Sequence, residues 1–353
     1  MKHISILLIT LLFFSCKKDQ EASAQRTYRM GFQNSAPTFN DTALFIQSLN
    51  LWTVRADAAI ISTEVPWNEL FSGVDAGAYV VDHYKDLAAF YRSKNLILWV
   101  YVDPQNGLDR TADATALIAT GKSIAQAAVQ EQYRRFVIAM DSILKPEHLG
   151  LALETNLIRF SSSRSVYGGV KQAANDVARE LKLKNSKAKL SVSIQVEMAW
   201  GVFGGVAFQG IGQDLIDFPF IEEIGFSSYP YFIFGKPAEI PTDYYSRLLL
   251  SNKFPVFISE GGWASKSVST PSISFISSNE IQKEYIERHH ELLQSIQATA
   301  LFQLTFTDID ITSLLPPIPA TLGYFTSLGL LDINMQPKPS LSAWDANFQK
   351  QLK

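Results

Sequence analysis

The chain of 353 residues contains one cysteine, Cys16, so no disulfide can form within it. A disulfide-stapled scaffold is excluded, and stability must come from the packing of a hydrophobic core. Charge is also scarce, because charged residues make up 18% of the chain and the formal net charge at pH 7 is −3. This balance offers no electrostatic basis for contact with phosphates, so we expect no nucleic-acid partner.

Histidine is rare, and none of the five histidines lies at the carboxyl end of a predicted strand. A metal-dependent barrel hydrolase requires His and Asp ligands at several such positions, so we expect no metal. The chain lacks a Gly-x-Ser-x-Gly nucleophile elbow and a Gly-rich dinucleotide fingerprint after its first predicted strand. No predicted strand contains a lysine for a Schiff base. We therefore expect no cofactor.

The first fifteen residues have the layout of a secretory signal peptide. Lys2 and His3 form a short basic head, an apolar run covers 4–14, and Ser15 precedes Cys16. The run is too short to span about 30 Å of hydrocarbon. Residues 13–16 (Phe-Phe-Ser-Cys) resemble the lipobox of bacterial lipoproteins. That resemblance implies a diacylated Cys16 at the mature N-terminus, and export to a bacterial membrane held by lipid alone. The alternative is an ordinary signal peptide cleaved near residues 22–24.

Residues 16–27 are polar and lack large apolar side chains, so we expect a lipidated flexible tether. The remaining residues, 28–353, show no linker, and 47% of the chain is hydrophobic. Together these features favour one large domain with a substantial core. We expect this domain to be a monomer, and residues 348–353 to fray from its last helix.

Eight short apolar runs alternate with amphipathic stretches along the domain. Most runs are continuously apolar, which is typical of parallel strands buried on both faces. They cover residues 28–33, 58–64, 96–103, 150–154, 190–197, 223–229, 256–260 and 300–306. The intervening stretches, including 41–49, 127–144, 170–183 and 280–296, have helical spacing, and Ser277 with Glu280 suggests a capping box. Eight β–α units predict an α/β fold, a single (β/α)₈ TIM barrel.

Acidic residues end five of the predicted strands and follow the eighth. An acid at the mouth of an apolar barrel is costly unless it is paired or used, so this pattern indicates a functional cleft. The acids are Glu64, Asp103, Glu154, Glu197 and Glu260, followed by Asp308 and Asp310. For Asp103, Glu197 and Asp310 the alternative is an ion pair with Arg55, Arg110 or Arg159.

Glu154 and Glu260 stand apart because they end strands four and seven, on opposite sides of a closed barrel. Their carboxylates can therefore face each other across the mouth. Two carboxylates about 5 to 5.5 Å apart suit a retaining glycosidase, one as acid/base and the other as nucleophile. Aromatic residues near the strand ends fit a sugar cleft, because their faces stack on pyranose rings. These are Trp67, Trp200, Tyr229, Tyr231, Phe232 and Trp263, and the alternative is that some of them pack under loops.

Three segments resemble glycoside hydrolase clan A, most nearly the family 53 endo-β-1,4-galactanases. They are residues 150–156 (GLALETN), 224–231 (IGFSSYPY) and 258–263 (ISEGGW). The resemblance implies Glu154 as acid/base, Glu260 as nucleophile, Tyr229 as hydrogen-bond donor to Glu260 and Trp263 as a sugar platform. With Glu64 as a further substrate contact, it predicts a retaining, endo-acting glycoside hydrolase that cleaves β-linked polysaccharide or oligosaccharide.

The segment around Glu154 departs from the family pattern. The clan has Asn before the acid/base, where it binds the sugar 2-hydroxyl, but this chain has Leu153. Asn156 can take that role only if the backbone presents it to the cleft. The arginine usual near the end of strand two is also missing, because Arg55 precedes the strand. The alternative function is therefore a lipoprotein that binds glycans in the same cleft without hydrolysing them.

Overall fold

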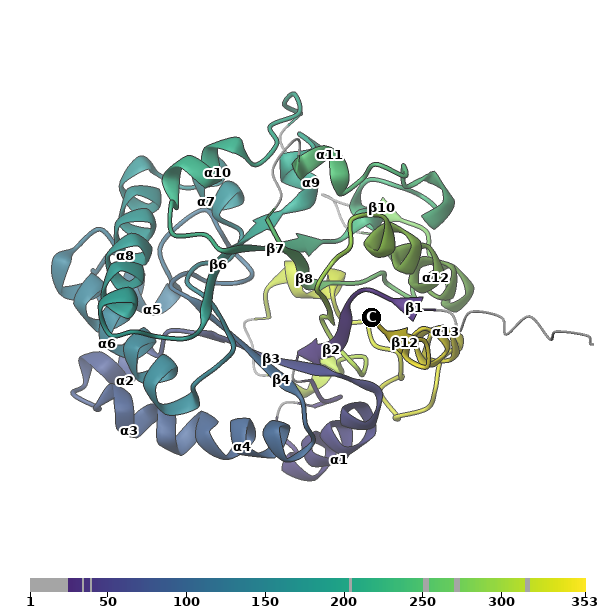
Figure 1. Ribbon diagram of the computed structural model, residues 1–353, viewed down its shortest axis with the longest axis horizontal. Coiled ribbons are helices and arrows are strands. Elements are labelled where there is room, and N and C mark those ends of the chain that lie inside the picture. The colour runs from purple at the N-terminus through teal and green to yellow at the C-terminus, as the bar shows by residue number, and fades with distance from the viewer. Residues whose placement is uncertain are drawn as a thin grey trace, which may run out of the picture.

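The computed structural model contains a closed barrel of eight parallel strands with helices around it (Figure 1). It describes residues 25–33, 35–38, 40–202, 205–249, 254–269, 274–314 and 318–353. The predicted signal peptide, the first part of the tether and Cys16 lie outside the described residues. The (β/α)₈ TIM-barrel prediction is confirmed.

The barrel strands follow one another in chain order, and β11 pairs with β2 to close the ring. They are β2 (Arg29–Gln33), β3 (Ala58–Glu64), β4 (Ile97–Asp103), β5 (His148–Gly150), β6 (Lys189–Gln195), β7 (Glu223–Ser228), β8 (Val256–Gly261) and β11 (Ala300–Gln303). Strand β5 is shorter than and offset from the predicted 150–154. Its hydrogen bonds to β6 nevertheless continue as far as Ala152, whose carbonyl accepts from the Ser193 N–H.

Helices connect the strands on the outside of the ring (Figure 1). The longer ones are α1 (Thr42–Trp52), α4 (Asp86–Ser93), α6 (Ala127–Leu144), α8 (Arg164–Leu183), α12 (Asn279–Ser295) and α13 (Pro339–Phe348). The shorter ones are α2 (Trp67–Phe71), α3 (Ala76–Val80), α5 (Thr115–Ala119), α7 (Thr155–Ser161), α9 (Val196–Ala199), α10 (Gly212–Asp217) and α11 (Ser246–Leu249). Helix α12 begins after Ser278, whose hydroxyl accepts from the Ile281 N–H, so the predicted capping role of Ser277 is wrong.

Large apolar side chains fill the interior of the barrel. Tyr101 crosses it, with its ring where a Gly150 side chain would lie and its hydroxyl against Gly225. That hydroxyl contacts the Ser191 hydroxyl at 3.0 Å. The same interior cluster contains Leu153, which is buried at its upper end. Leu153 therefore belongs to the floor beneath the barrel mouth and gives that floor an apolar surface.

The two ends of the described chain meet. Strands β1 (Gln25–Arg26) and β12 (Gln351–Leu352) pair in parallel, and Arg26 is buried in an ion pair with Asp57 at 2.6 Å. Residues 25–27 therefore belong to the folded domain and not to the tether that the sequence predicted. The predicted fraying after the last helix is also wrong, because β1 supplies the hydrogen-bond partners of β12.

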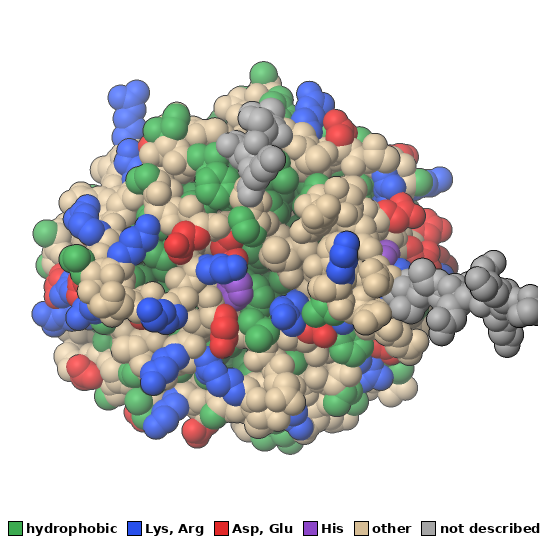
Figure 2. All heavy atoms as spheres, viewed as in Figure 1, with side chains coloured by type: hydrophobic (Ala, Val, Ile, Leu, Met, Phe, Trp, Pro, Cys, Tyr) green, Lys and Arg blue, Asp and Glu red, His purple; other side chains and the backbone are tan. Residues whose placement is uncertain are grey.

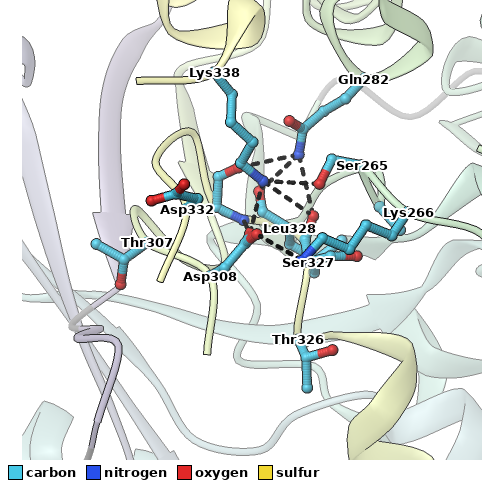
Figure 3. A network of polar contacts seen from close by, with 12 residues as sticks. Ser265, Lys266, Gln282, Thr307, Asp308, Thr326, Ser327, Leu328, Asp332 and Lys338 are labelled. Atoms are coloured by element: carbon cyan, nitrogen blue, oxygen red, sulfur yellow. Dashed lines mark hydrogen bonds and ion pairs between the residues drawn. The ribbon is translucent and has the colours of Figure 1, made fainter. Parts of the chain in front are cut away.

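Long loops follow β8 and β11. The first carries a hairpin of β9 (Val268–Ser269) and β10 (Ser274–Phe275). The second is anchored by a buried ion pair between Asp308 and Lys338 at 2.7 Å, which Figure 3 shows surrounded by Ser265, Ser327 and Gln282. The Asp308 carboxylate also accepts from the Gly329 N–H at 3.1 Å. This network fixes the returning end of the loop against the start of α13.

On the face shown in Figure 2, Lys and Arg side chains lie scattered among neutral and apolar ones. They do not form one continuous band there. Within the part of the chain that the structure describes, no helix is long and apolar enough to cross a membrane.

Candidate active site

A pocket of about 410 Å³ lies at the carboxyl ends of the barrel strands. Its wall combines four carboxyl groups, one arginine, polar side chains of β2, β3 and β6, and apolar side chains from the loops. The lining residues are Gln33, Ser62, Thr63, Glu64, Asp103, Gly107, Leu108, Arg110, Leu153, Glu154, Leu157, Gln195, Tyr229, Phe232, Glu260, Leu304, Thr321, Tyr324 and Phe325. Such a volume is in the range of small-ligand sites.

Glu154 occupies an unusual backbone position directly before α7. Its φ of 49° and ψ of 46° lie in the left-handed region, which costs a residue with a side chain about 1–2 kcal/mol. The Glu154 N–H donates to the Ser193 hydroxyl at 2.8 Å, which ties the turn to β6. Backbone strain of this kind is characteristic of functional sites. The turn directs the carboxylate into the pocket instead of along the helix.

Arg110 holds Glu154 and Asp103 together. Its Nε donates to Glu154 at 3.0 Å and one terminal nitrogen donates to Asp103 at 2.6 Å, and all three side chains are nearly inaccessible to solvent. Burial raises the pKa of Asp103 to about 6, although the charge of Arg110 opposes that shift. Asp103 therefore forms an ion pair with Arg110, the alternative that the sequence left open for it.

Ser227 joins the two predicted catalytic carboxyls. Its hydroxyl oxygen lies 2.7 Å from Oε1 of Glu154 and 2.9 Å from Oε1 of Glu260. These two distances add to 5.6 Å, which is therefore the upper limit for the separation of the two carboxyl oxygens. That limit lies close to the separation of about 5 to 5.5 Å that retaining glycosidases use.

The pair formed by Glu154 and Glu260 holds a proton above the usual range of a carboxyl group. Burial and the negative charge of Glu154 together raise the pKa of Glu260 to about 7, while the charge of Arg110 opposes the shift. A hydroxyl carries one hydrogen, so Ser227 donates to only one of the two carboxyls. The other contact is a hydrogen bond only when that carboxyl is protonated and donates to Ser227.

Glu197 lies beneath the pocket and not in it. Its carboxylate accepts from the Tyr244 hydroxyl at 2.6 Å and from the Tyr229 N–H at 2.7 Å. Burial raises its pKa to about 7. The alternative that Glu197 pairs with an arginine does not hold, because the donors to its carboxylate are uncharged. Asp310 likewise accepts from Thr312 instead of pairing with an arginine.

The structure brings Glu64, Glu154, Tyr229, Phe232 and Glu260 into the pocket wall. The predicted hydrogen bond from Tyr229 to Glu260 is not formed. Within the described residues, the side-chain hydroxyl that contacts Glu260 is that of Ser227. Tyr229 contributes its ring to the wall instead, next to Phe325.

The predicted role of Asn156 is wrong. Its side-chain amide exchanges two hydrogen bonds with the backbone of Gln195, at 2.8 and 2.9 Å, because α7 turns it toward β6. The predicted roles of Trp263 and Tyr231 are wrong as well. Trp263 is 1% exposed and donates to the Ser277 hydroxyl, while the Tyr231 hydroxyl donates to the Tyr324 carbonyl.

Two further tryptophans also lie outside the pocket wall. Trp67 is buried against Phe71 at the start of α2. Trp200 stacks on Tyr244, and its indole N–H donates to the Tyr244 carbonyl. Both rings pack beneath loops, which is the alternative that the sequence left open for the aromatic residues.

Sequence reasoning missed three features of the pocket. Ser227 lies in the segment 224–231, in which the sequence pattern assigns a role to Tyr229 alone. Gln195 ends β6, and no motif marks it. Phe325 lies in the loop after β11, far along the chain from the other pocket residues. Arg110 was considered only as a neutralising partner. Its position seven residues after Asp103 was the available signal for a shared site. Within the described ranges, no group of three or more His, Cys, Asp or Glu residues is arranged to hold a metal ion.

Comparison with solved structures identifies barrels of the same shape at low sequence identity. A β-glucosidase from Exiguobacterium marinum has a TM-score of 0.64 and 11% identity, with 91% of this chain and 98% of that one covered. A GH5_18 variant from Bifidobacterium longum, in complex with Manb1-4GlcNAc, has a TM-score of 0.61 and 13% identity, with coverages of 91% and 78%.

A β-glucuronidase from an uncultured Clostridium has a TM-score of 0.57 and 14% identity, and covers 92% of this chain. This chain spans about half the length of that enzyme, at 50%. No protein-family model and no curated protein matches the sequence. The likeness therefore establishes the barrel fold that these glycosidases share, and the chemistry must be argued from the pocket itself.

Proposed function

We propose that this protein is a retaining glycoside hydrolase that cleaves a glycosidic bond between Glu154 and Glu260. The observation that carries the proposal is the shared contact of both carboxyls with Ser227, which limits their separation to 5.6 Å. Two carboxyls at that distance leave room for a covalent glycosyl-enzyme but not for an intervening water molecule. The glycosidase barrels that share this fold are consistent with the proposal.

The resemblance to clan A assigns Glu154 as acid/base and Glu260 as nucleophile. The raised pKa of Glu260 instead places the proton that the two carboxyls share on Glu260. We propose that Ser227 exchanges it. The Glu260 carboxyl gives its proton to the Ser227 oxygen while the Ser227 hydroxyl gives its own to Glu154. The exchange leaves Glu154 protonated and Glu260 ionised, and the serine unchanged. The contacts of 2.7 and 2.9 Å are short enough for both transfers.

Bond cleavage then follows two steps. Glu154 protonates the glycosidic oxygen as Glu260 attacks the anomeric carbon, so the leaving group departs as an alcohol. Glu154, now a carboxylate, removes a proton from water, which displaces Glu260 from the sugar. The second step restores both carboxyls. Strain at the left-handed backbone of Glu154 keeps the acid/base aimed at the bond.

The substrate proposed is a β-linked oligosaccharide, or the end of a β-linked polysaccharide. A pocket of about 410 Å³ with apolar walls from Tyr229, Phe232 and Phe325 favours a short stretch of sugar over a long chain. The endo-β-1,4-galactanase activity that the sequence suggested therefore remains one specific form of the proposal, to be compared with release of terminal sugars.

Hydrolysis of a panel of β-linked polysaccharides and aryl β-glycosides, beginning with β-1,4-galactan, tests the proposal. Proton NMR of the first product should show retention at the anomeric carbon. Glu260→Ala and Glu154→Ala should each lower turnover about 10²–10⁴-fold, the range for loss of a catalytic proton-transfer group. Glu69→Ala, an exposed acid of α2, is the matched control. Full activity in Glu260→Ala, or inversion of configuration, would rule the mechanism out.

One observation favours a second candidate, a glycan-binding protein without turnover. Leu153 lines the pocket where the resemblance has a sugar-binding asparagine, and the structure makes it part of the apolar barrel interior. A protein that binds oligosaccharides from the same panel but releases no reducing sugar during long incubation would have this function.

We also propose that Cys16 carries the lipid anchor, so that the barrel acts outside the cytoplasm. Metabolic labelling with radioactive palmitate in a bacterial host is the test. Wild-type protein should be labelled and sediment with membranes, whereas Cys16→Ser should be unlabelled and released. Equal labelling of both proteins would contradict the anchor.

A further inference from the structure

The pocket wall carries charge almost entirely of one sign. Its ionisable carboxyls are Glu64, Asp103, Glu154 and Glu260, and its one basic side chain is Arg110. Even with one proton shared between Glu154 and Glu260, the carboxylates outnumber the cation. A ligand that enters this pocket therefore meets a negative potential at short range and within a poorly hydrated wall.

Arg110 cannot readily serve an anionic ligand. It is buried, with 4% of its side chain exposed, and it donates to Glu154 at 3.0 Å and to Asp103 at 2.6 Å. To turn toward a substrate carboxylate it would have to leave one of these two acids buried without its cation. Such a group is costly because burial penalises the charged form. The arginine therefore balances the pocket's own acids.

Glu64 holds one of the negative charges that Arg110 leaves unbalanced. It lies at the end of β3 and is exposed on the pocket wall, and one carboxylate oxygen accepts from the Gly107 N–H at 3.0 Å. Within the described residues, no ion pair involves Glu64. The hydrogen bond to Gly107 fixes the carboxylate in place, so its negative charge faces whatever occupies the pocket.

We propose that the pocket accepts neutral or amino-bearing sugars and rejects uronic acids, with Glu64 as the residue that discriminates between them. This inference rests on the proposed function only in that the pocket binds a sugar. The proposed rejection of uronic acids would distinguish this chain from the β-glucuronidase with which it shares the barrel fold. A uronate would place a carboxylate among at least two others, whereas an ammonium group would gain a partner in Glu64.

Binding of non-hydrolysable sugars to the full-length protein tests the proposal. The probes are 4-nitrophenyl 1-thio-β-glycosides in gluco and galacto configuration, each as the neutral sugar, the 6-carboxylate and the 2-amino-2-deoxy sugar. Isothermal titration at pH 6 keeps the carboxylate ionised and the amine charged. In the configuration that binds best, the uronide should bind at least about 100-fold more weakly than the neutral sugar, an effect within the range for a desolvated like charge.

Glu64→Gln should strengthen uronide binding about 10-fold and weaken binding of the amino sugar by a similar factor, with little change for the neutral sugar. Glu69→Gln removes an exposed acid of α2, which follows β3 and lies outside the pocket wall, and should change binding of none of the three sugars. Uronide binding equal to or tighter than that of the neutral sugar overturns the inference, and so does the failure of every probe to bind. Hydrolysis is measured separately, so binding without turnover would defeat only the proposed activity.

Discussion

At the scale of single residues, the backbone of Glu154 combines strain with function. Its left-handed conformation costs a glutamate about 1–2 kcal/mol, whereas asparagine tolerates it far better. We expect Glu154→Asn to abolish hydrolysis and to lower the free energy of unfolding about 1 kcal/mol less than Glu154→Ala does, because both variants lose the ion pair to Arg110 and only asparagine tolerates the left-handed backbone. Chemical denaturation measures the change.

The matched variant for this prediction is Glu154→Ala. Alanine removes the same carboxylate but keeps a side chain that is unfavourable at positive φ, so the alanine variant should be less stable than the asparagine variant. If the alanine variant were the more stable of the two, the left-handed turn would not be the source of the strain.

Ser227 gives the second prediction at this scale. If its hydroxyl exchanges the shared proton, Ser227→Ala should lower kcat by about 10–100-fold and leave KM nearly unchanged, a fraction of the loss expected for a full acid/base. Ser227→Thr keeps a hydroxyl and should retain most of the turnover. Steady-state kinetics on an aryl glycoside with a poor leaving group supplies both constants. A threonine variant as slow as the alanine variant would indicate a packing role alone.

At the scale of elements, continuous apolar runs identified all eight barrel strands, because parallel strands buried on both faces leave little room for polar residues. The acids at the strand ends were predictable for the same reason: they mark where the chain leaves the apolar interior. The aromatic residues were not. Whether Trp263 faces a pocket or the core depends on how the loop carrying Ser277 folds over it, and local sequence does not encode that.

The loop after β11 depends on a buried ion pair, which leads to a prediction at this scale. Lys338→Met should leave Asp308 buried without its cation and destabilise the fold by about 3–5 kcal/mol. Figure 3 shows how many loop groups meet at this lysine. Because the same loop supplies Tyr324 and Phe325 to the pocket, ligand affinity should fall as well.

Lys283→Met serves as the control for that prediction. Lys283 pairs with Glu287 at 2.9 Å on the exposed side of α12. Surface pairs of this kind contribute at most about 1 kcal/mol, so the control should unfold almost as the wild type does. Equal effects of the two substitutions in thermal denaturation would show that the Asp308 network does not anchor the loop.

At the scale of the whole molecule, buried acids and buried histidines have opposite effects on how folding stability changes with pH. Burial raises the pKa of Glu197 and Glu260 to about 7 and of Asp103 to about 6. The folded state therefore binds protons as pH falls from 8 to 6, where the unfolded carboxyls do not. Stability should rise over that window by up to about 1.4 kcal/mol per pH unit for each carboxyl.

Two buried histidines slow this rise in stability at lower pH. Burial lowers the pKa of His289 to about 3 and of His290 to about 4, so below pH 6.5 only the unfolded state protonates them. Their contribution offsets that of two of the three acids, so we expect the rise in melting temperature to be much slower between about pH 6 and 4.5. Calorimetry across pH 4 to 9 measures it. Glu197→Gln should flatten the rise between pH 8 and 6, and an unchanged slope would contradict this assignment.

The pairing of β1 with β12 brings the two ends of the described chain side by side. Gln25 lies beside Gln351, and the Lys353 N–H donates to the Arg26 carbonyl at 3.0 Å. Joining the two ends through a short Gly-Ser connection, and reopening the chain between α8 and β6, should give a circular permutant with the same strand order around the barrel. In such a molecule Glu260 would precede Glu154 along the chain, yet both would meet at Ser227 as before.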